Sequence, residues 1–490
     1  MAASGSKALQ VKVSATVDGK KIHPTQVKLI NSINTMAQAS ITYIHKTADA
    51  NKKATNVTAK DVFTAMAERQ TKSFKDTPDS PGVSLSLKDA YNGSVNFRGN
   101  VSSPNYTFSS GDVMLTENVQ TDYSSLNCMD LSIYEQVVYN LNQVKAKDYP
   151  ETIAEIIKKV ITDMVEKGDN QINTIEDKIK KAAFKKQHDI NKKVVKFAEE
   201  LLENSKETMG WGGVINESNK SSIITQIRQR VTEALKGKTG GGFFNNILRV
   251  AEEFQCVYVP GLDNVGKLVN KKSLLADSTN LTLHPVTLSV QAGSVGMFPV
   301  RAVIVNQPVN SQDANTSANL DRAKKANLAA MFPEDPAEGG TILSVLGPQW
   351  LPSGEYNIAK IESTTDKGKS KKKKLQKNKL DKDKAKGAKK VTKSVKASFE
   401  NNEKVIEQWA ETVYYWQALG QAYAIINTEL NLKLQVGKRY TVRGDSGVLF
   451  SGILNAIEHT INTSFKSSSA ASQLQFSHIV MASAKIPGIE

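Results

Sequence analysis

The sequence predicts an α+β fold with an antiparallel β domain at each end of the chain. Apolar and polar residues alternate with a period of two near both ends, which is typical of half-buried strands. From about residue 149 the apolar spacing changes to the helical period of 3.6, which predicts an inserted helical subdomain. A helix and several strand-like runs follow, and these predict a small mixed α/β domain.

The first β domain is predicted over residues 1–130. An alternating run over residues 9–17 ends at Asp18-Gly19, a strong hairpin turn, and similar runs cover 27–33 and 39–43. Thr58 is a candidate N-cap for a short helix around residues 62–66, with Asp61 supporting its first turn. The stretch VSLSLKDAYNGSVNFRG predicts two more strands around Asn92-Gly93.

The helical subdomain is predicted over residues 131–240. Pro150 suits a helix start, and an apolar stripe from Ile153 to Val165 indicates a helix that ends at Gly168. A longer Lys-rich amphipathic helix follows and runs through residues 201–202. A third helix extends from residue 223 to 235 and is closed by Gly237.

Three further segments complete the predicted organisation. Residues 241–310 form the mixed domain, with a helix over 247–254 that leads into the strand QCVYV. Residues 311–400 are rich in Ala, Lys, Asn and Gly, so we expect a linker or loop there. Residues 401–490 begin with a helix that places Val405, Trp409, Val413 and Trp416 roughly along one face, and then return to strand patterning.

The net charge of +15 is concentrated in one place. Residues 367–396 hold fifteen Lys and two Asp, so the rest of the chain is nearly neutral. The two cysteines, Cys128 and Cys256, are too few for a disulfide framework or a zinc cluster, and both are expected to be buried thiols. The first ten residues do not resemble a signal peptide and no apolar run could span a bilayer, so we expect a cytoplasmic chain.

The stretch VRGDSGVLFSG, residues 442–452, allows three interpretations. Arg443-Gly444-Asp445 matches an integrin-type tripeptide, and residues 444–447 match the nucleophile loop of trypsin-like proteases. The protease interpretation needs an upstream His and Asp, and the sequences around the histidines do not supply them. The third interpretation, a tight turn between two strands, explains every residue through the conformational freedom of Gly and the local bonding of Asp and Ser.

Other candidate motifs are equally weak. The stretch GLDNVGKL, residues 261–268, is one residue short of a phosphate-binding P-loop, because Leu268 stands where Ser or Thr would hold magnesium. The six histidines are scattered, and the sequence has no HExxH or CxxC motif. We therefore predict no catalytic, cofactor-binding or metal-ligating residue, no cofactor and no small-molecule substrate.

Two hairpins near opposite ends of the chain share a short motif. SVNFRGNV at 94–101 and GVLFSGIL at 447–454 both contain Val-x-Phe-x-Gly followed by an apolar residue two positions on. Each follows a turn and an alternating strand. This similarity suggests one β-unit used twice, although two unrelated hairpins could also have converged on these residues.

The sequence resembles the baseplate hub proteins of contractile phage tails, tailocins and type VI secretion spikes. The resembling stretches are VDGKKIHPTQVKLINSINTMAQASITY, VNFRGNV, ILRVAEEFQCVYV and LQVGKRYTVRGDSGVLFSGILNAIEHTINTSFKSSSAASQLQFSHI, about half of the chain. The resemblance implies two tail-tube-like antiparallel β-barrels per chain and a homotrimer. The helical insertion and the Lys-rich tract depart from that family.

The resemblance also implies a structural, non-enzymatic role in the virion. Three chains with two similar barrels each would adapt a six-fold tail tube to a three-fold central spike. The implied partners are the spike protein, the tail tube or tube-initiator protein, the tape-measure protein and baseplate wedge proteins. The machine would assemble in the host cytoplasm and reside in the tail baseplate.

Two alternative functions remain open from the sequence. The Lys-rich tract could be a solvated loop, or it could bind DNA, the tape measure or a membrane through salt-sensitive attraction. The candidate polyanion contacts are Lys371, Lys372, Lys373, Lys374, Lys389 and Lys390. The other alternative is a hub with peptidoglycan-hydrolase activity, although no inserted catalytic domain is recognisable.

Overall fold

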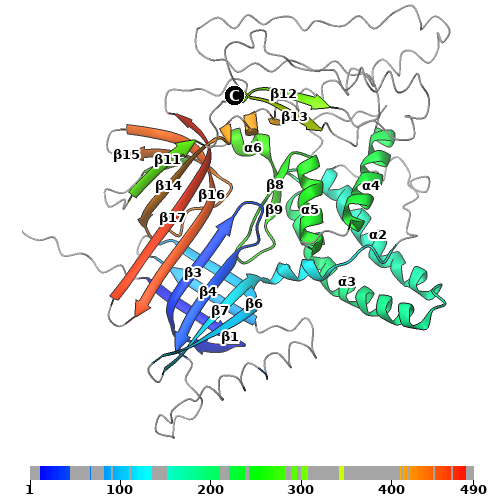
Figure 1. Cartoon of the computed structure of the whole chain (residues 1–490), viewed down its shortest axis with the longest axis horizontal. Coiled ribbons are helices and arrows are strands. Elements are labelled where there is room, and N and C mark those ends of the chain that lie inside the picture. The colour runs from blue at the N-terminus through cyan, green and yellow to red at the C-terminus, as the bar shows by residue number, and fades with distance from the viewer. Residues whose placement is uncertain are drawn as a thin grey trace, which may run out of the picture.

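The structure is a computed structural model, and its β-structure and helices occupy different sides of the molecule (Figure 1). It describes the larger part of the chain in several separate ranges. The described residues are 11–44, 64, 67, 82–89, 92–109, 112–134, 152–209, 220–237, 242–276, 279–282, 289–294, 300–306, 341–346, 409, 412–413, 415–417, 419–444, 447–464 and 467–481.

The N-terminal half-sheet consists of seven strands in the order β3-β4-β7-β6-β5-β1-β2. Neighbouring strands are antiparallel throughout. Positive φ angles at Asp18, Gly19 and Asn92 fit the tight turns predicted there. The strands are β1 (Lys12–Val17), β2 (Lys20–Ile22), β3 (Pro24–Ser32), β4 (Gln38–Ile44), β5 (Gly82–Lys88), β6 (Ser94–Ser109) and β7 (Asp112–Thr121).

The C-terminal half-sheet has the order β11-β14-β17-β16-β15-β10. All its pairs are antiparallel except β10 with β15, which is parallel. Strands β10 and β11 come from the segment expected to form the mixed domain. The strands are β10 (Thr279–Thr282), β11 (Ser289–Ser294), β14 (Ala422–Glu429), β15 (Arg439–Gly444), β16 (Gly447–Ser464) and β17 (Ser467–Met481).

Strand β16 joins the two half-sheets into one 13-stranded sheet. One edge of β16 pairs with β15 as far as Ile453, and from Ala456 to Asn462 the same edge pairs with β3. The main path of this sheet runs from β11 to β2 without closing, within the residues that the structure describes. The predicted mostly antiparallel α+β fold is confirmed, whereas two closed barrels are not observed in these ranges.

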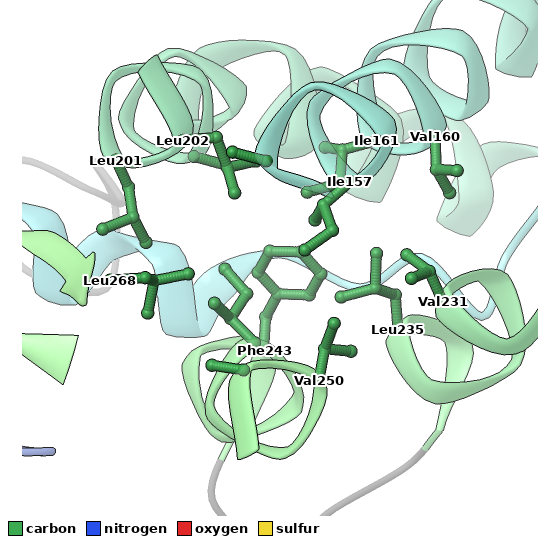
Figure 2. Close-up of a cluster of buried hydrophobic side chains, with 14 of the residues drawn as sticks. Ile157, Val160, Ile161, Leu201, Leu202, Val231, Leu235, Phe243, Val250 and Leu268 are labelled. Atoms are coloured by element: carbon green, nitrogen blue, oxygen red, sulfur yellow. The ribbon is translucent and has the colours of Figure 1, made fainter. Parts of the chain in front are cut away.

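Four helices pack into a separate apolar core beside the sheet (Figures 1 and 2). Figure 2 shows apolar side chains from all four, and from Leu268, gathered around the ring of Phe243. Thr152 caps the first helix and forms a full capping box with Glu155. The helix therefore begins at Ile153, about one turn after Pro150, where the sequence suggests a helix start. The helices are α2 (Ile153–Asn173), α3 (Lys178–Asn204), α4 (Lys220–Lys236) and α5 (Gly242–Glu253).

Smaller elements connect these layers. The 3-10 helix η1 (Asp122–Cys128) follows β7, and β8 (Cys256–Val259) pairs antiparallel with β9 (Lys267–Asn270). Helix α6 (Lys271–Ala276) follows β9, and β12 (Val300–Asn306) pairs in parallel with β13 (Thr341–Leu346). Residues 409, 412–413, 415–417 and 419 are helical, in the stretch where the C-terminal helix is predicted.

Two local predictions are wrong. Helix α2 does not end at Gly168 but continues to Asn173. Gly168 is there for close packing instead of a helix end, since a Cβ at this position would lie 2.4 Å from Tyr134 and 3.0 Å from His188. Cys128 is exposed at the end of η1, whereas Cys256 is buried and burial raises the pKa of its thiol to about 12. The predicted helix around residues 62–66 lies almost entirely outside the described residues, and the division of the chain into five segments stays a prediction.

Candidate assembly interface

The two half-sheets use the same strand order. Reading each along the chain, β1, β3, β4, β5, β6 and β7 occupy the positions that β10, β11, β14, β15, β16 and β17 occupy in the other. The two differ at one pair, since β1 is antiparallel to β5 and β10 is parallel to β15. Strand β2 and the insertion of β12 and β13 are additions to this shared plan.

From its Phe to its Gly, the shared sequence motif pairs in the same register in both halves. Phe97 of β6 lies opposite Leu85 of β5, and Phe450 of β16 lies opposite Val442 of β15. A bulge follows the motif in each case, after Val101 in β6 and at Leu454 in β16. Strand order, the pairing of the Phe and one bulge therefore agree, so the repeat suggested by seven residues extends to the fold. The second copy differs in two further register shifts, one at Val442 and one between Ser451 and Ile453.

The glycine of the motif has an equivalent position in each half, but the space available for a side chain there differs. A Cβ on Gly99 would lie 2.1 Å from the carbonyl oxygen of Gln120 in β7. A Cβ on Gly452 would lie 3.2 Å from the carbonyl oxygen of Ser477 in β17. Only glycine allows the close approach of β7 at the first site, whereas the second site has more room.

The turn between β3 and β4 contributes to three separate apolar cores. Ile33 belongs to the core of the C-terminal half-sheet, Met36 to the helical core and Ala37 to the core of the N-terminal half-sheet. The Ile33 amide donates to the carbonyl oxygen of Asn455 in β16 (2.9 Å). We call residues 33–37 the joint, because one turn fixes the three cores relative to one another.

Asn34 connects the joint to strand β8. Its amide donates to the carbonyl oxygen of Tyr258 (2.8 Å), and its side-chain Oδ1 accepts from the Tyr258 amide (2.9 Å). Asn34 adopts a φ of 60°, a left-handed conformation that asparagine tolerates better than most residues. Sequence reasoning missed this residue, although Asn in the short polar stretch between two strand patterns is a turn signal.

The β8–β9 hairpin is a two-faced ribbon between the helical core and the C-terminal half-sheet. Tyr258 and Leu268 are fully buried in the helical core, whereas Val257 and Val269 are buried in the core of the half-sheet. This alternation follows from the period of two in a strand. An almost wholly apolar strand is the sequence signal for burial on both faces, and QCVYV fits it.

The loop of this hairpin contacts the N-terminal half-sheet. Leu262 packs against the core of that half-sheet, and its carbonyl oxygen accepts from the Arg98 amide (3.2 Å). The hydroxyl of Tyr123 donates to the carbonyl oxygen of Gly261 (2.9 Å). GLDNVGKL is therefore a connection between two antiparallel strands rather than a P-loop, because a strand follows it where a P-loop needs a helix.

A buried carboxylate also links the two half-sheets. Asp89 accepts from the Gly93 amide (2.6 Å) and from the Leu432 amide (2.9 Å). Leu430 and Leu432 are buried in the core of the N-terminal half-sheet, although they follow β14 of the other half. The half-sheets are therefore joined by strand pairing, by shared cores and by this carboxylate.

Among the described residues, the two ends of the sheet's main path differ in character. Strand β2 is three residues long and carries Lys20 and Lys21, both exposed, which discourages pairing with another strand. Strand β11, SVQAGS, has no charged residue and no proline, and Val290 is 50% exposed. An uncharged, exposed edge strand is a site at which another strand can add to the sheet.

The turn at 442–452 is a β-hairpin. Strands β15 and β16 pair up to Gly444 and Gly447, and Gly447 has a φ of 110°. The turn interpretation is confirmed, and residues 445–446 at its tip lie outside the described ranges.

The candidate polyanion contacts of the Lys-rich tract lie outside the described residues. They are Lys371, Lys372, Lys373, Lys374, Lys389 and Lys390.

The described residues contain no group of three or more His, Cys, Asp or Glu side chains placed to hold a metal ion. His188 is buried beside Tyr134, with 2.7 Å between its Nδ1 and the tyrosine hydroxyl, so it is a partnered core residue. His459 is buried with its Nδ1 2.9 Å from Ser472 Oγ, and burial lowers its pKa to about 4. Among the described helices, none has the length and apolar character to cross a membrane.

Several solved structures are similar to this chain along most of its length. A 43 kDa tail protein of prophage MuSo2 from Shewanella oneidensis is 8% identical, with 95% of this chain and 98% of that chain covered and a TM-score of 0.43. A tail protein from Neisseria meningitidis MC58 is 8% identical, with 95% and 96% covered and a TM-score of 0.44. The E. coli c3393 protein, a component of the type VI secretion system, is 8% identical, with 98% and 80% covered and a TM-score of 0.34.

These are proteins of the class that the sequence resembles: phage tail proteins and a type VI secretion component. No protein-family model matches the sequence, and no curated protein matches it significantly.

Proposed function

We propose that the protein is a structural baseplate hub of a contractile phage tail or a related injection machine, and that it works as a homotrimer in the virion baseplate. The observation that carries the proposal is the repeat of one strand order in two half-sheets of a single chain. Three such chains around an axis present six similar units on one face and keep three-fold symmetry on the other. The trimer would therefore adapt a six-fold tail tube to a three-fold central spike.

The exposed edge of β11 supports a contact between chains. A sheet that ends in an uncharged strand is a liability in a solitary molecule, and pairing with a neighbour removes it. In the proposed trimer a neighbouring chain covers β11, so that each half-sheet contributes to a closed, barrel-like wall. At the other end of the main path, the lysines of β2 discourage pairing with a strand of another chain.

The joint supports a mechanical role. A hub that connects two symmetries must hold its two units at a fixed angle, and residues 33–37 tie both half-sheets to the helical core. The proposed partners are the spike protein on the three-fold side, the tail tube or tube-initiator protein on the six-fold side, the tape-measure protein and baseplate wedge proteins. In this role the protein makes and breaks no covalent bond.

The proposal is tested by the symmetry of the purified protein. We expect sedimentation analysis to give a trimer, and averaged electron micrographs to give a three-fold particle with six similar lobes on one face. A chain that stays monomeric at all concentrations, alone and with spike and tube proteins present, would overturn the proposal.

A pair of substitutions separates the edge contact from a loss of folding. Val290→Lys places a charge on β11, and a charged side chain on an edge strand discourages another strand from pairing with it, so we expect the trimer to dissociate. Val290→Thr keeps a β-branched side chain without charge and serves as the matched control, which should stay trimeric. Dissociation of both variants, or of neither, would show that β11 is not the contact.

A further inference from the structure

The α2–α3 hairpin carries an unusual surface on the outward side of α3. Figure 1 shows the two helices side by side, with their connection directed away from the sheet. Helix α3 buries one face, which includes His188, Asn191, Val194 and Ala198. The opposite face, which we call the lysine face, consists of Lys178, Lys185, Lys186, Lys192, Lys193 and Lys196, all exposed.

The spacing of these lysines places them in two adjacent rows. Lys178, Lys185 and Lys192 follow one another at intervals of seven residues, and so do Lys186 and Lys193. Seven residues make almost two helical turns, so each row runs nearly parallel to the helix axis with about 10 Å between members. The rows form a regular positive strip along most of the helix.

The negative charges near the lysine face lie mostly at its two ends, where Asp177 precedes Lys178 and where Asp122 of η1 attracts Lys196. Lys192 pairs with Asp169 of α2, with 2.5 Å between Nζ and Oδ2, and Asp189 is the one acidic residue within the face itself. Among the described side chains, none forms an ion pair with the other five lysines. The acidic residues of α3 are concentrated instead in its last turns, as Glu199, Glu200 and Glu203.

An exposed apolar side chain lies within this positive strip. Ile179 is 84% exposed, well above Val290 at 50% and Ile44 at 44%, the other large exposed hydrophobic residues of the described chain. It stands one heptad before Lys186, so it lies in the row that continues to Lys193. Its position next to the connection with α2 places it at the free end of the hairpin.

We propose that the lysine face and Ile179 form a docking surface for an anionic lipid membrane. Clustered lysines are attracted to the negative headgroup layer, and an exposed isoleucine among them can enter the apolar boundary beneath that layer. Phosphates of a nucleic acid match the lysines equally well but give Ile179 no apolar contact, so the lipid surface fits both observations. This inference is independent of the proposed hub function.

Vesicle binding by the full chain tests the charge contribution. Wild-type protein should bind vesicles of phosphatidylcholine and phosphatidylserine, and should not bind pure phosphatidylcholine. The variant Lys178→Gln, Lys185→Gln, Lys186→Gln should bind roughly 100-fold more weakly, at about fivefold per lysine. The matched control is Lys12→Gln, Lys88→Gln, Lys433→Gln, which removes three exposed lysines of the β-structure.

The control should change binding by less than a few fold. Every chain in the comparison keeps the lysines of residues 367–396, so any attraction from that tract is common to all of them. Equal weakening in the two triple variants would overturn the proposal, because it would show dependence on total charge alone. Circular dichroism confirms that each variant is folded.

A fluorescent probe at residue 179 tests the apolar contribution separately. Ile179→Cys is made together with Cys128→Ser, so that position 179 carries the exposed thiol while Cys256 stays buried. An environment-sensitive dye on this thiol should shift to the blue with phosphatidylserine vesicles and stay unchanged with double-stranded DNA. An unchanged emission with the vesicles, or a shift with DNA, would refute lipid docking by this surface.

Discussion

Replacing Asn34 tests whether the joint holds the molecule together. Asn34→Gly keeps the left-handed backbone but removes the acceptor of the Tyr258 amide. We expect the unfolding free energy to fall by about 1 kcal/mol, near the lower end for a lost hydrogen bond, because Asn34 is exposed and water can replace its oxygen. Asn34→Ala also forces a Cβ into a left-handed conformation, which adds about 1–2 kcal/mol. Asn34→Asp keeps the acceptor and should be nearly neutral.

Two measurements read out this series. Urea unfolding gives the free energies, and hydrogen exchange reports on the Tyr258 amide itself. That amide should lose protection in the Gly and Ala variants and keep it in the Asp variant. Equal losses of stability in the Gly and Ala variants would refute the role of the left-handed conformation. Full protection in the Gly variant would refute the role of the side-chain oxygen.

Three other substitutions test the repeat, the buried histidine and the helical core. Gly99→Ala should cost about 1–3 kcal/mol, because a Cβ would lie 2.1 Å from a carbonyl oxygen, whereas Gly452→Ala, at 3.2 Å, should cost less than about 1 kcal/mol; equal melting shifts would contradict this. The pKa of His459 is lowered from 6.5 to about 4, chiefly by burial, so the unfolded chain takes up a proton that the folded chain does not. The unfolding free energy should therefore fall by up to about 1.4 kcal/mol per pH unit as the pH drops from 6.5 to 4, and His459→Asn should reduce that slope. Phe243→Ala, at the centre of the helical core in Figure 2, should cost about 3–5 kcal/mol in urea unfolding, and a loss below 1 kcal/mol would contradict the packing.

Local elements could be predicted from the sequence because their signals are local. A two-residue turn such as Asp18-Gly19 fixes the register of the strands beside it, and apolar spacing alone locates the buried face of α2. Gly168 shows the limit of this reasoning. A glycine in a helical pattern indicates either an end or a close approach, and the approaching residue, Tyr134, lies more than thirty positions away in sequence.

The joining of the half-sheets could not be predicted, because it has no local signal. The pairing of Ala456 with Ser32 brings together residues that are more than 400 positions apart, and its hydrogen bonds come from the backbone. The one related signal in the sequence is the length of the strand pattern. Strand β16 extends from Gly447 to Ser464, whereas β15 covers only Arg439–Gly444, so part of the edge of β16 is left for another strand.

In the proposed trimer, the unlike ends of the main sheet set the type of contact between copies of this chain. The main path ends in β11 at one end and in the lysine-bearing β2 at the other, so in the proposed ring β11 pairs with a different surface of the neighbouring chain. Such head-to-tail contacts form a ring if the rotation between neighbours closes and a filament if it does not. A hub needs closure, so we expect the mass measured by sedimentation to stop rising at three chains even at high concentration. Continued growth with concentration would mean that β11 forms an open, fibre-like contact, and the six-lobed ring would then be excluded.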